Sequence, residues 1–309
     1  MRYDAHFDSC GAGQIHYYRW TPEGQPRAVV QIVHGIAEFA ARYDDFARFL
    51  NRLGYLVVAD DHMGHGKSIR NSTQGYFTGG WFAAVADSFQ LLKMTRKEFP
   101  DLPYVLLGHS MGSFMVRTIL CKYPDSGITA AILSGTGWQP GKGLPVMHTL
   151  CKAECRRIGE KTPSRTLDKL IFGGYNRRVE HPKTKFDWLT RDQNVVDTYI
   201  AHPGCGFVAS AGLMRDLVEG LMYIESEENL AAMDKKLPVL FIAGGDDPVG
   251  SYGKGVRRTA EEFQKAGMEQ VDTKIYPLCR HEILNEINRR EVYEDVSQWM
   301  EKQIFEKAE

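Results

Sequence analysis

Short apolar runs alternate along this chain with stretches of helical period, and this alternation constrains the fold more than any other feature. The runs Tyr55–Ala59, Val105–Leu107 and Ile128–Ser134 are short enough for strands buried on both faces. The stretches expected to be helical around them are Tyr43–Leu53, Trp81–Phe99 and Phe114–Tyr123. Strand–helix alternation of this kind predicts an α/β fold with a mostly parallel central sheet, flanked by helices on both faces. Before them, Ile15–Trp20 and Ala28–Val33 are predicted as hairpin strands.

The alternation stops after Ser134 and resumes near residue 235. Residues 135–234 show helical stretches and Gly/Pro turns without a convincing strand. The resumed elements are a strand at Val239–Ala243, a helix at Gly253–Ala266, a strand at Val271–Tyr276 and a helix at Glu291–Phe305. We therefore expect a core of residues 1–134 and 235–309, with residues 135–234 inserted as a helical cap over the carboxyl edge of the sheet. That edge is where open α/β sheets bind ligands.

Composition and charge exclude several classes of protein. The 309 residues carry a net charge of −1, which gives no overall attraction to nucleic acid and does not fix the oligomeric state. No run of about 18 apolar residues is present, so no transmembrane helix is expected. The first residues lack the apolar stretch of an export signal, which favours the cytoplasm and six cysteines in the thiol state.

The strongest local motif is Gly108-His109-Ser110-Met111-Gly112, which fits the pattern G-x-S-x-G. An apolar strand leads into it and an amphipathic helix follows it. So sharp a strand-to-helix turn strains the serine backbone, and side chains at Gly108 and Gly112 would collide with neighbouring elements. The motif in this context predicts Ser110 as a nucleophile held at a helix N-terminus.

A serine hydroxyl needs a base to take its proton, and both partners of such a base follow later strands. His281 follows the strand Val271–Tyr276, and two carboxylates, Asp246 and Asp247, follow the strand Val239–Ala243. We expect His281 to be the general base. An acid should accept the Nδ1 hydrogen bond of this histidine, and Asp247 is the preferred candidate, although spacing alone does not separate it from Asp246.

Acyl transfer also needs hydrogen-bond donors for the oxyanion that forms in the reaction. One donor in sites of this kind is the N–H of the residue after the nucleophile, here Met111. The other comes from the loop after an early strand, where Gly35 would let the chain turn and the Ile36 N–H is the candidate donor. A simple turn at His34-Gly35 is the alternative interpretation.

Neither a metal nor an organic cofactor is expected. His148, Cys151 and Cys155 lie close together in a helical stretch, but a fourth ligand is not evident. His62 and His65 are better explained as residues that order the loop after Tyr55–Ala59. The sequence Gly66-Lys67-Ser68 resembles the end of a phosphate-binding loop, but that motif requires glycine where this chain has Asp61.

Five blocks together resemble the monoacylglycerol lipase and lysophospholipase branch of the α/β hydrolases, a branch often labelled serine aminopeptidase S33-type. The blocks, in family order, are HGIAEFAARY at 34–43, DHMGHGKS at 61–68, GHSMG at 108–112, GGDDPVG at 244–250 and RHEILNE at 280–286. The segments FDWLTRD at 186–192 and CGF at 205–207 also resemble bacterial members.

The resemblance implies the α/β-hydrolase fold and hydrolysis of single-acyl lipid esters. It implies a triad of Ser110, Asp247 and His281, with Ile36 and Met111 as oxyanion donors, and it favours Asp247 over Asp246. One departure is Phe39, where the family often has histidine after the loop glutamate. That change leaves the backbone donors in place but weakens any inference that glycerol binds as in the animal lipases.

The expected cap is basic. Between Lys142 and Arg191 there are twelve Lys or Arg residues and five acids, on a chain that is almost neutral overall. Leucines and other apolar residues lie among them, as in Leu144–Leu150 and Leu167–Phe172. Such a cap is suited to a transient contact with anionic lipid surfaces, and a solvated basic face over an ordinary core is the alternative.

Three functions remain open from the sequence. The first is an esterase that acts on monoacylglycerols or lysophospholipids through an acyl-enzyme intermediate. The second is a peptidase that uses the same triad, with Glu225, Glu227 and Glu228 as candidates to hold a peptide ammonium group. The third is a binding protein without catalysis, which the intact set of Ser, Asp and His disfavours.

Overall fold

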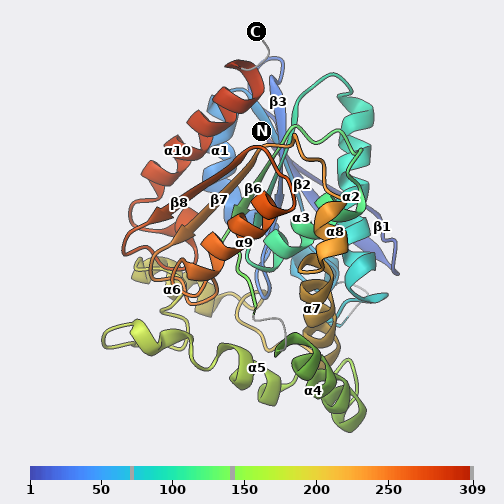
Figure 1. Cartoon of the computed structure of the whole chain (residues 1–309), viewed down its shortest axis with the longest axis vertical. Helices are drawn as coiled ribbons and strands as arrows, with labels where there is room; N and C mark the ends of the chain where they lie inside the picture. The colour runs from blue at the N-terminus through green and yellow to red at the C-terminus, as the bar shows by residue number, and fades with distance from the viewer. Residues whose placement is uncertain (70–72, 140–142, 307–309) are drawn as a thin grey trace.

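The computed structural model describes residues 1–69, 73–139 and 143–306, and its centre is an eight-stranded sheet (Figure 1). The strand order is β1-β2-β4-β3-β5-β6-β7-β8. The pairs from β4 to β8 are all parallel, whereas β2 runs antiparallel to both β1 and β4. The mostly parallel sheet predicted from the sequence is therefore confirmed. The strands are β1 Arg2–Asp8, β2 Gln14–Trp20, β3 Ala28–Val33, β4 Tyr55–Asp60, β5 Tyr104–His109, β6 Ala130–Ser134, β7 Val239–Gly244 and β8 Val271–Tyr276.

The hairpin at the start of the chain differs from the prediction. β2 does not pair with β3, because β4 lies between them in the sheet. The partner of β2 in the hairpin is β1, in a register that sets Arg2 opposite Trp20. The sequence analysis missed β1 because Phe7 is its one buried side chain, so the strand shows no apolar alternation.

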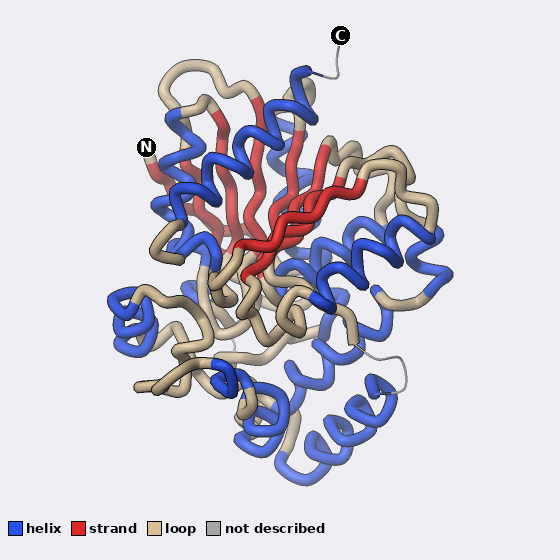
Figure 2. The backbone as a smooth tube through the Cα atoms, turned by 60° about the vertical axis from the view of Figure 1, so that its left-hand side comes forward, coloured by secondary structure: helices blue, strands red, loops and turns tan. Residues whose placement is uncertain are grey.

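Helices cover both faces of the sheet (Figure 2). Alternate side chains of β3 point to opposite faces of the sheet. Val29 and Val33 join one apolar cluster, and Val30 and Ile32 join the other. The first cluster includes residues of α2, α3 and α9, and the second includes residues of α1 and α10. These helices are α1 Asp44–Arg52, α2 Gly80–Glu98, α3 Met111–Lys122, α9 Lys254–Lys265 and α10 Arg289–Glu301.

Two predicted helix ends are shifted. α3 begins at Met111 rather than Phe114, directly after the strained turn at Ser110. The last predicted helix is divided, because α10 ends at Glu301 and the chain continues as a π-helical turn over Lys302–Glu306. The short 3₁₀ turns are η1 Ala40–Tyr43, η2 Gly66–Ile69, η3 Tyr175–Arg178 and η4 Ile283–Asn285.

The described residues between β6 and β7 contain helices and no strand, apart from an isolated bridge between Pro163 and Ser210. Side-chain caps start three of the helices: Ser164, Asp192 and Ser210 accept backbone N–H bonds in α5, α6 and α7. The helices are α4 Gly143–Ile158, α5 Arg165–Phe172, α6 Gln193–Ala201, α7 Ala211–Ile224 and α8 Glu227–Ala231.

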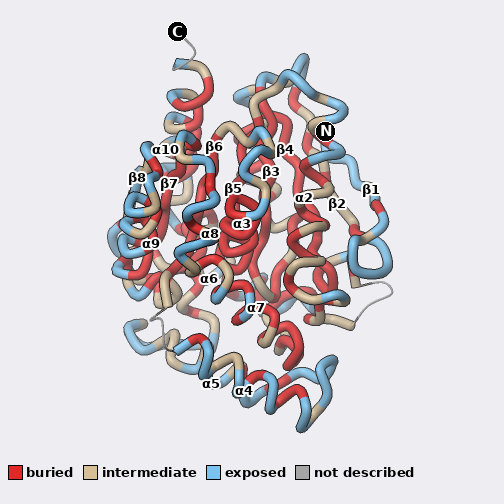
Figure 3. Tube along the Cα trace, turned by 45° about the vertical axis from the view of Figure 1, so that its right-hand side comes forward, coloured by how far each residue is buried: buried red, intermediate tan, exposed pale blue. Residues whose placement is uncertain are grey.

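Apart from α8, which lies beside α3, these helices lie at the end of the sheet opposite the chain's C-terminus, with α4 and α5 outermost (Figure 1). α7 lies against α3 and buries Leu213, Met214 and Leu217 in the same cluster as the residues of α3, and α4 adds Leu144, Cys151 and Cys155 to that cluster. Figure 3 shows the central strands β3 to β7 buried, whereas the edge strands β1 and β8 and much of the surface of α4 and α5 are exposed. In the described ranges, no helix combines the length and apolar character needed to cross a bilayer.

Candidate active site

Ser110 lies at the turn between β5 and α3, with a backbone φ of 52° and ψ of −122°. This positive φ strains a residue with a side chain, and such strain is typical of a nucleophile presented above a sheet. The two motif glycines explain how the turn closes. A Cβ atom at Gly108 would lie 2.5 Å from the Gly112 carbonyl oxygen, and one at Gly112 would lie 2.0 Å from the Val33 carbonyl oxygen.

His281 and Asp247 meet at the carboxyl ends of β8 and β7. Nδ1 of His281 lies 3.0 Å from Oδ2 of Asp247, and both side chains are buried. Asp246 is only half-buried, and its backbone N–H donates a hydrogen bond to the Cys279 carbonyl. Burial opposes a charged imidazole, but the Asp247 carboxylate raises the pKa of His281 above its ordinary value. Asp247 rather than Asp246 is therefore the carboxylate in contact with the histidine, and its role in fixing the histidine tautomer stays a prediction.

Ser110 and His281 line the same cavity. In the described part of the chain, the hydrogen bond of the His281 ring goes to Asp247, and none joins the ring to Ser110 Oγ. Catalytic hydrogen bonds often become short only when substrate is bound, so this geometry is compatible with proton transfer between the two. Gly135 gives the ring its space, because a Cβ atom there would lie 2.9 Å from a carbon of His281.

The loop after β3 lies against the serine. A Cβ atom at Gly35 would be 3.1 Å from the Cβ of Ser110. His34 fixes the next peptide: its Nε2 accepts the His62 N–H, so Nδ1 carries the proton and donates to the Gly35 carbonyl at 2.7 Å. Carbonyl and N–H point in opposite directions across one peptide plane. The Ile36 N–H is thereby oriented away from His34, and it has no hydrogen-bond partner among the described residues.

Met111 supplies the second N–H of the expected pair. It is the first residue of α3, and the first four N–H groups of a helix have no partner within the helix. Its N–H and that of Ile36 come from the two backbone segments that flank Ser110. The arrangement can therefore hold an oxyanion, and the roles of both residues stay a prediction.

His62 is hydrogen-bonded to this loop. Its Nδ1 lies 3.0 Å from the Asp60 carboxylate and its Nε2 lies 3.0 Å from the His34 carbonyl, so both nitrogens face acceptors. Although burial disfavours the charge, the bond to Asp60 raises the pKa of His62. No group of three or more possible ligand side chains that could hold a metal ion occurs in the described ranges, including at Cys151 and Cys155.

A buried ion network connects the loop after β3 with the loop that carries His281. The sequence analysis missed this network. Arg42 donates to Glu38 at 2.6 Å and binds both carboxylate oxygens of Glu282 at 2.7 and 2.6 Å. Glu38 also accepts the Gly35 N–H at 2.6 Å. Burial raises the pKa of a carboxyl group, but Arg42 holds the pKa of Glu282 down at about 2. The i, i+4 spacing of Glu38 and Arg42 was the available signal, whereas Glu282 lies 240 residues away.

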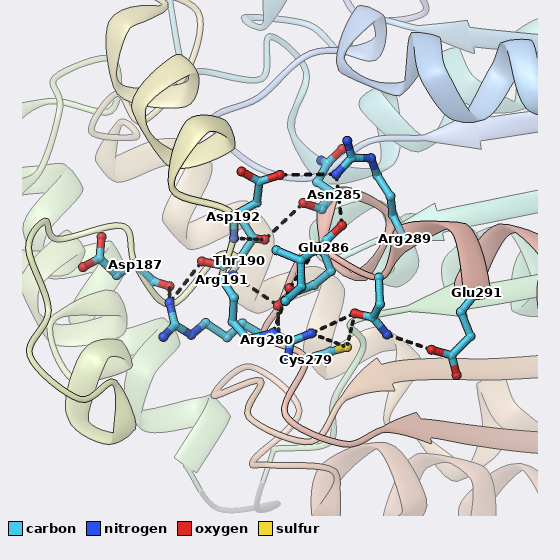
Figure 4. Close-up of polar contacts among 12 residues, drawn as sticks. Asp187, Thr190, Arg191, Asp192, Cys279, Arg280, Asn285, Glu286, Arg289 and Glu291 are labelled. Carbon is cyan, nitrogen blue, oxygen red and sulfur yellow. Dashed lines mark hydrogen bonds and ion pairs between the residues drawn. The ribbon is translucent and has the colours of Figure 1, made fainter.

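The His281 loop is also tied to the insertion, as Figure 4 shows for the contacts between residues 187–192 and 279–291. The backbone N–H of His281 donates to the Trp188 carbonyl at 3.3 Å, and that of Glu282 donates to the Leu189 carbonyl at 2.7 Å. Arg280 donates to two carbonyls of the same segment, and Arg191 pairs with Glu286. Residues 187–192 therefore hold the loop that carries the candidate base.

The cavity beside Ser110 has a volume of about 480 Å³, a size typical of small-molecule sites. One side is apolar and is formed by α3, α4 and α7, with Phe114, Leu144, Met147, Leu217, Val218 and Leu221. The other side is aromatic, and the Trp188 ring lies 5.0 Å from the His281 ring, centroid to centroid.

The carboxylates considered for a peptide ammonium group lie elsewhere. Glu225 accepts the Gln139 N–H at 2.7 Å and does not line the cavity. Glu227 and Glu228 are exposed in the first turn of α8. The structure therefore offers no support for these three residues as a subsite for a peptide N-terminus.

Comparison with known proteins identifies the family. The family model described as "Serine aminopeptidase, S33" matches residues 24–288, which include every candidate site residue. The chain belongs to this family. The monoacylglycerol lipase branch, inferred from the five sequence blocks, is also confirmed, because relatives of this chain are monoacylglycerol lipases.

One relative is the monoacylglycerol lipase of Mycolicibacterium smegmatis, 30% identical over 304 residues that cover 95% of each chain. Another is the monoglyceride lipase of Rattus norvegicus, 40% identical over 286 residues, with 89% of this chain and 86% of the relative covered. Among solved structures, a thermostable carboxyl esterase from Bacillus coagulans in complex with glycerol superposes with a TM-score of 0.91 at 29% identity, over 98% of this chain and 99% of that one. The predicted α/β-hydrolase fold is confirmed by this similarity.

Proposed function

We propose that this protein hydrolyses carboxylic esters of single-acyl lipids, monoacylglycerols or lysophospholipids, through an acyl-enzyme on Ser110. The observation that carries the proposal is the buried hydrogen-bonded pair of His281 and Asp247, whose histidine lines a largely apolar cavity together with Ser110. The relatives named as monoacylglycerol lipases and the carboxyl esterase of similar structure support an ester as the substrate.

In the proposed reaction, Ser110 Oγ attacks the ester carbonyl carbon while His281 Nε2 takes the hydroxyl proton. The carbonyl oxygen becomes an oxyanion, which accepts hydrogen bonds from the Ile36 and Met111 N–H groups. Asp247 stabilises the imidazolium that forms. His281 then returns the proton to the leaving alcohol, and the C–O bond breaks to leave the acyl group on Ser110.

Deacylation repeats these steps with water. His281 takes a proton from the water that attacks the acyl carbonyl, and the fatty acid leaves as Ser110 regains its proton. No step calls for a metal or an organic cofactor.

Residues 135–234 act in this proposal as a cap over the cavity, and α4 and α5 would also touch the lipid surface that supplies the substrate. Val146 and Leu150 on α4 and Leu170 on α5 are 61%, 47% and 54% exposed, and the basic residues Lys152 and Arg156 of α4 are exposed as well. Apolar side chains among basic ones favour anionic interfaces. Lys142, counted among the basic residues of the sequence, lies outside the described residues. The cytoplasmic location expected from the sequence stays a prediction, as does the thiol state of the six cysteines, which are all unpaired here.

The experiment compares wild type and Ser110→Ala on a matched panel. The panel contains p-nitrophenyl esters of increasing chain length, a long-chain monoacylglycerol, a lysophosphatidylcholine and aminoacyl p-nitroanilides. The proposal predicts turnover that is highest on the single-acyl lipids and lost in Ser110→Ala. Anilide cleavage above ester cleavage would assign the site to peptides, and no Ser110-dependent turnover would contradict the proposal.

A further inference from the structure

The loop that carries the Ile36 N–H is strained and needs to be held. Ala37 has a φ of 54°, a conformation that residues with side chains rarely adopt and that costs about 1–3 kcal/mol unless contacts impose it. On the side of the sheet, the contacts are the bonds from His34 to the Gly35 carbonyl and from the Gly35 N–H to Glu38. Both bonds are made by backbone groups of Gly35, the residue before Ile36. After Ile36, core contacts such as the bond from the Ala40 N–H to Asp61 hold the loop, but the Ala37 carbonyl itself is held from a different part of the molecule.

Residues 199–206 of the insertion supply that second anchor. The Tyr199 hydroxyl, on α6, donates to the Ala37 carbonyl at 2.8 Å, and the Gly206 N–H donates to the same oxygen at 3.0 Å. The Tyr199 side chain is buried, with 6% of the residue exposed. Its ring also lies under the Arg42 guanidinium, whose central carbon is 4.8 Å from the ring centroid. α6 is thus joined both to the strained residue and to the ion network beside it.

The protonation of Tyr199 suits this role. Burial raises the pKa of its hydroxyl well above the ordinary value, so the group keeps its proton and remains a donor at any pH at which the enzyme works. The Ala37 carbonyl is an obligate acceptor, which makes the direction of this hydrogen bond unambiguous.

We infer that Tyr199 is a positioning residue for the oxyanion site. Its hydroxyl holds the Ala37 carbonyl, so that Ile36 is fixed between two clamped peptides and its N–H stays directed at the cavity. This inference rests on the proposed function, because it gives the Ile36 N–H its role in acyl transfer. It also assigns the insertion a part in the chemical step, beyond lining the cavity.

The inference predicts that a change at Tyr199 lowers kcat and leaves KM nearly unchanged. An oxyanion donor acts on charge that develops in the transition state, so a misdirected donor slows the chemical step and leaves binding of the ground-state ester nearly unchanged. Losing the donor altogether costs about 10²–10³-fold in kcat in comparable sites. Tyr199→Phe leaves the Gly206 bond in place, and we expect kcat to fall by about ten- to a hundredfold.

The experiment uses Tyr199→Phe and a matched control, Tyr104→Phe. The Tyr104 hydroxyl is equally buried and donates to the Gln31 amide oxygen at 2.7 Å, at the start of β5 and away from the site. Each variant is assayed with p-nitrophenyl butyrate for kcat and KM. Each is also titrated with an alkyl trifluoromethyl ketone, whose reversible serine adduct carries an oxyanion, and melted to obtain its Tm.

The expected result is a lower kcat and weaker ketone inhibition by a similar factor in Tyr199→Phe, with KM and Tm within the range of Tyr104→Phe. Equal kcat in the two variants would overturn the inference and leave the esterase intact. A raised KM at unchanged kcat would overturn it too, because Tyr199 would then contact substrate. A Tm loss far beyond the control, with kcat restored at low temperature, would reduce Tyr199 to a structural residue. Wild type without Ser110-dependent turnover would refute both the inference and the proposed function.

Discussion

Two parts of the insertion differ in how they meet the catalytic loops. The anchored segment, residues 186–206, is bonded to both of them: Trp188 and Leu189 accept backbone bonds from the His281 loop, and Tyr199 and Gly206 hold Ala37. Of the outer helices, α4 packs on α7, and both α4 and α5 contribute residues to the lining of the cavity. Their outward side chains are largely exposed (Figure 3).

The difference indicates a division of labour within one insertion. The anchored segment lies close to groups that must be placed within fractions of an ångström, and polar contacts hold it at many points. The outer helices contribute apolar side chains, which select substrates by shape and area rather than by orientation. Changes near the anchored segment should therefore affect the chemical step for every ester, whereas changes in the outer helices should affect mainly long-chain esters.

The largest effect is expected from Asp247→Asn, because Asp247 contacts His281, whose loop the anchored segment holds. An amide at this position can hold His281 in the wrong tautomer, and comparable replacements lower kcat by about 10⁴-fold. The loss should be the same for short and long esters. Asp246→Asn is the matched control, one residue away and half-buried, and should keep kcat within about twofold of wild type. A similar loss in both variants would reject Asp247 as the specific partner of His281.

The next effect is on stability. Arg42→Met leaves Glu38 and Glu282 buried without their common cation, and breaking a buried pair in this way costs about 3–5 kcal/mol. In the wild type, Arg42 holds the pKa of Glu282 at about 2, below its ordinary 4.5, so the part of the stabilisation that comes from Glu282 is present above pH 4.5 and lost as the pH falls toward 2, whereas burial raises the pKa of Glu38. Urea unfolding at pH 7 and at pH 3 measures both. Arg258→Met, which breaks an exposed pair on α9, should cost less than about 1 kcal/mol.

A third effect concerns pH. His281 accepts the serine proton only when its ring is neutral, and Asp247 raises the pKa of this ring above 6.5. The value of kcat/KM should fall about tenfold per pH unit below an apparent pKa that itself lies above 6.5. A pH profile with p-nitrophenyl butyrate gives this value. An acid limb with a pKa below 6.5 would contradict the placement of His281 as a buried base paired with a carboxylate.

The smallest effect is expected in the outer helices. Met147 of α4 lines the apolar side of the cavity, and Met147→Ala removes area that only a long acyl chain contacts. We expect kcat/KM for a long-chain monoacylglycerol to fall about five- to tenfold, with p-nitrophenyl butyrate unchanged. Thr149→Ala, at an exposed position of α4 that does not line the cavity, is the control and should change neither. Equal losses on short and long esters in Met147→Ala would break the proposed division of labour.

Local sequence signals predicted the parts of the site that one short segment determines. The strand-to-helix turn around Ser110 and the positions of Asp247 and His281 after successive strands follow from apolar periodicity and from the topology of parallel sheets. β1 escaped prediction because its side chains are mostly exposed, so its place in the sheet depends on pairing with β2 and not on an apolar pattern.

The contacts of the anchored segment could not be predicted for a different reason. Tyr199 and Ala37 are 162 residues apart, and Arg280 and Asp187 are 93 apart. Nothing in the local sequence of α6 distinguishes a tyrosine that packs in a core from one that holds a loop. Such pairs exist only once the insertion has folded back onto the sheet, and a single sequence carries no record of that pairing.

The central claim, an acyl-enzyme on Ser110, is tested most directly by mass spectrometry of enzyme quenched with acid during turnover of p-nitrophenyl palmitate. Wild type should carry one palmitoyl group, on the peptide that contains Ser110, and the group should disappear as the substrate is exhausted. Ser110→Ala should carry none. Palmitoyl on another residue, or turnover at the wild-type rate in Ser110→Ala, would contradict the claim.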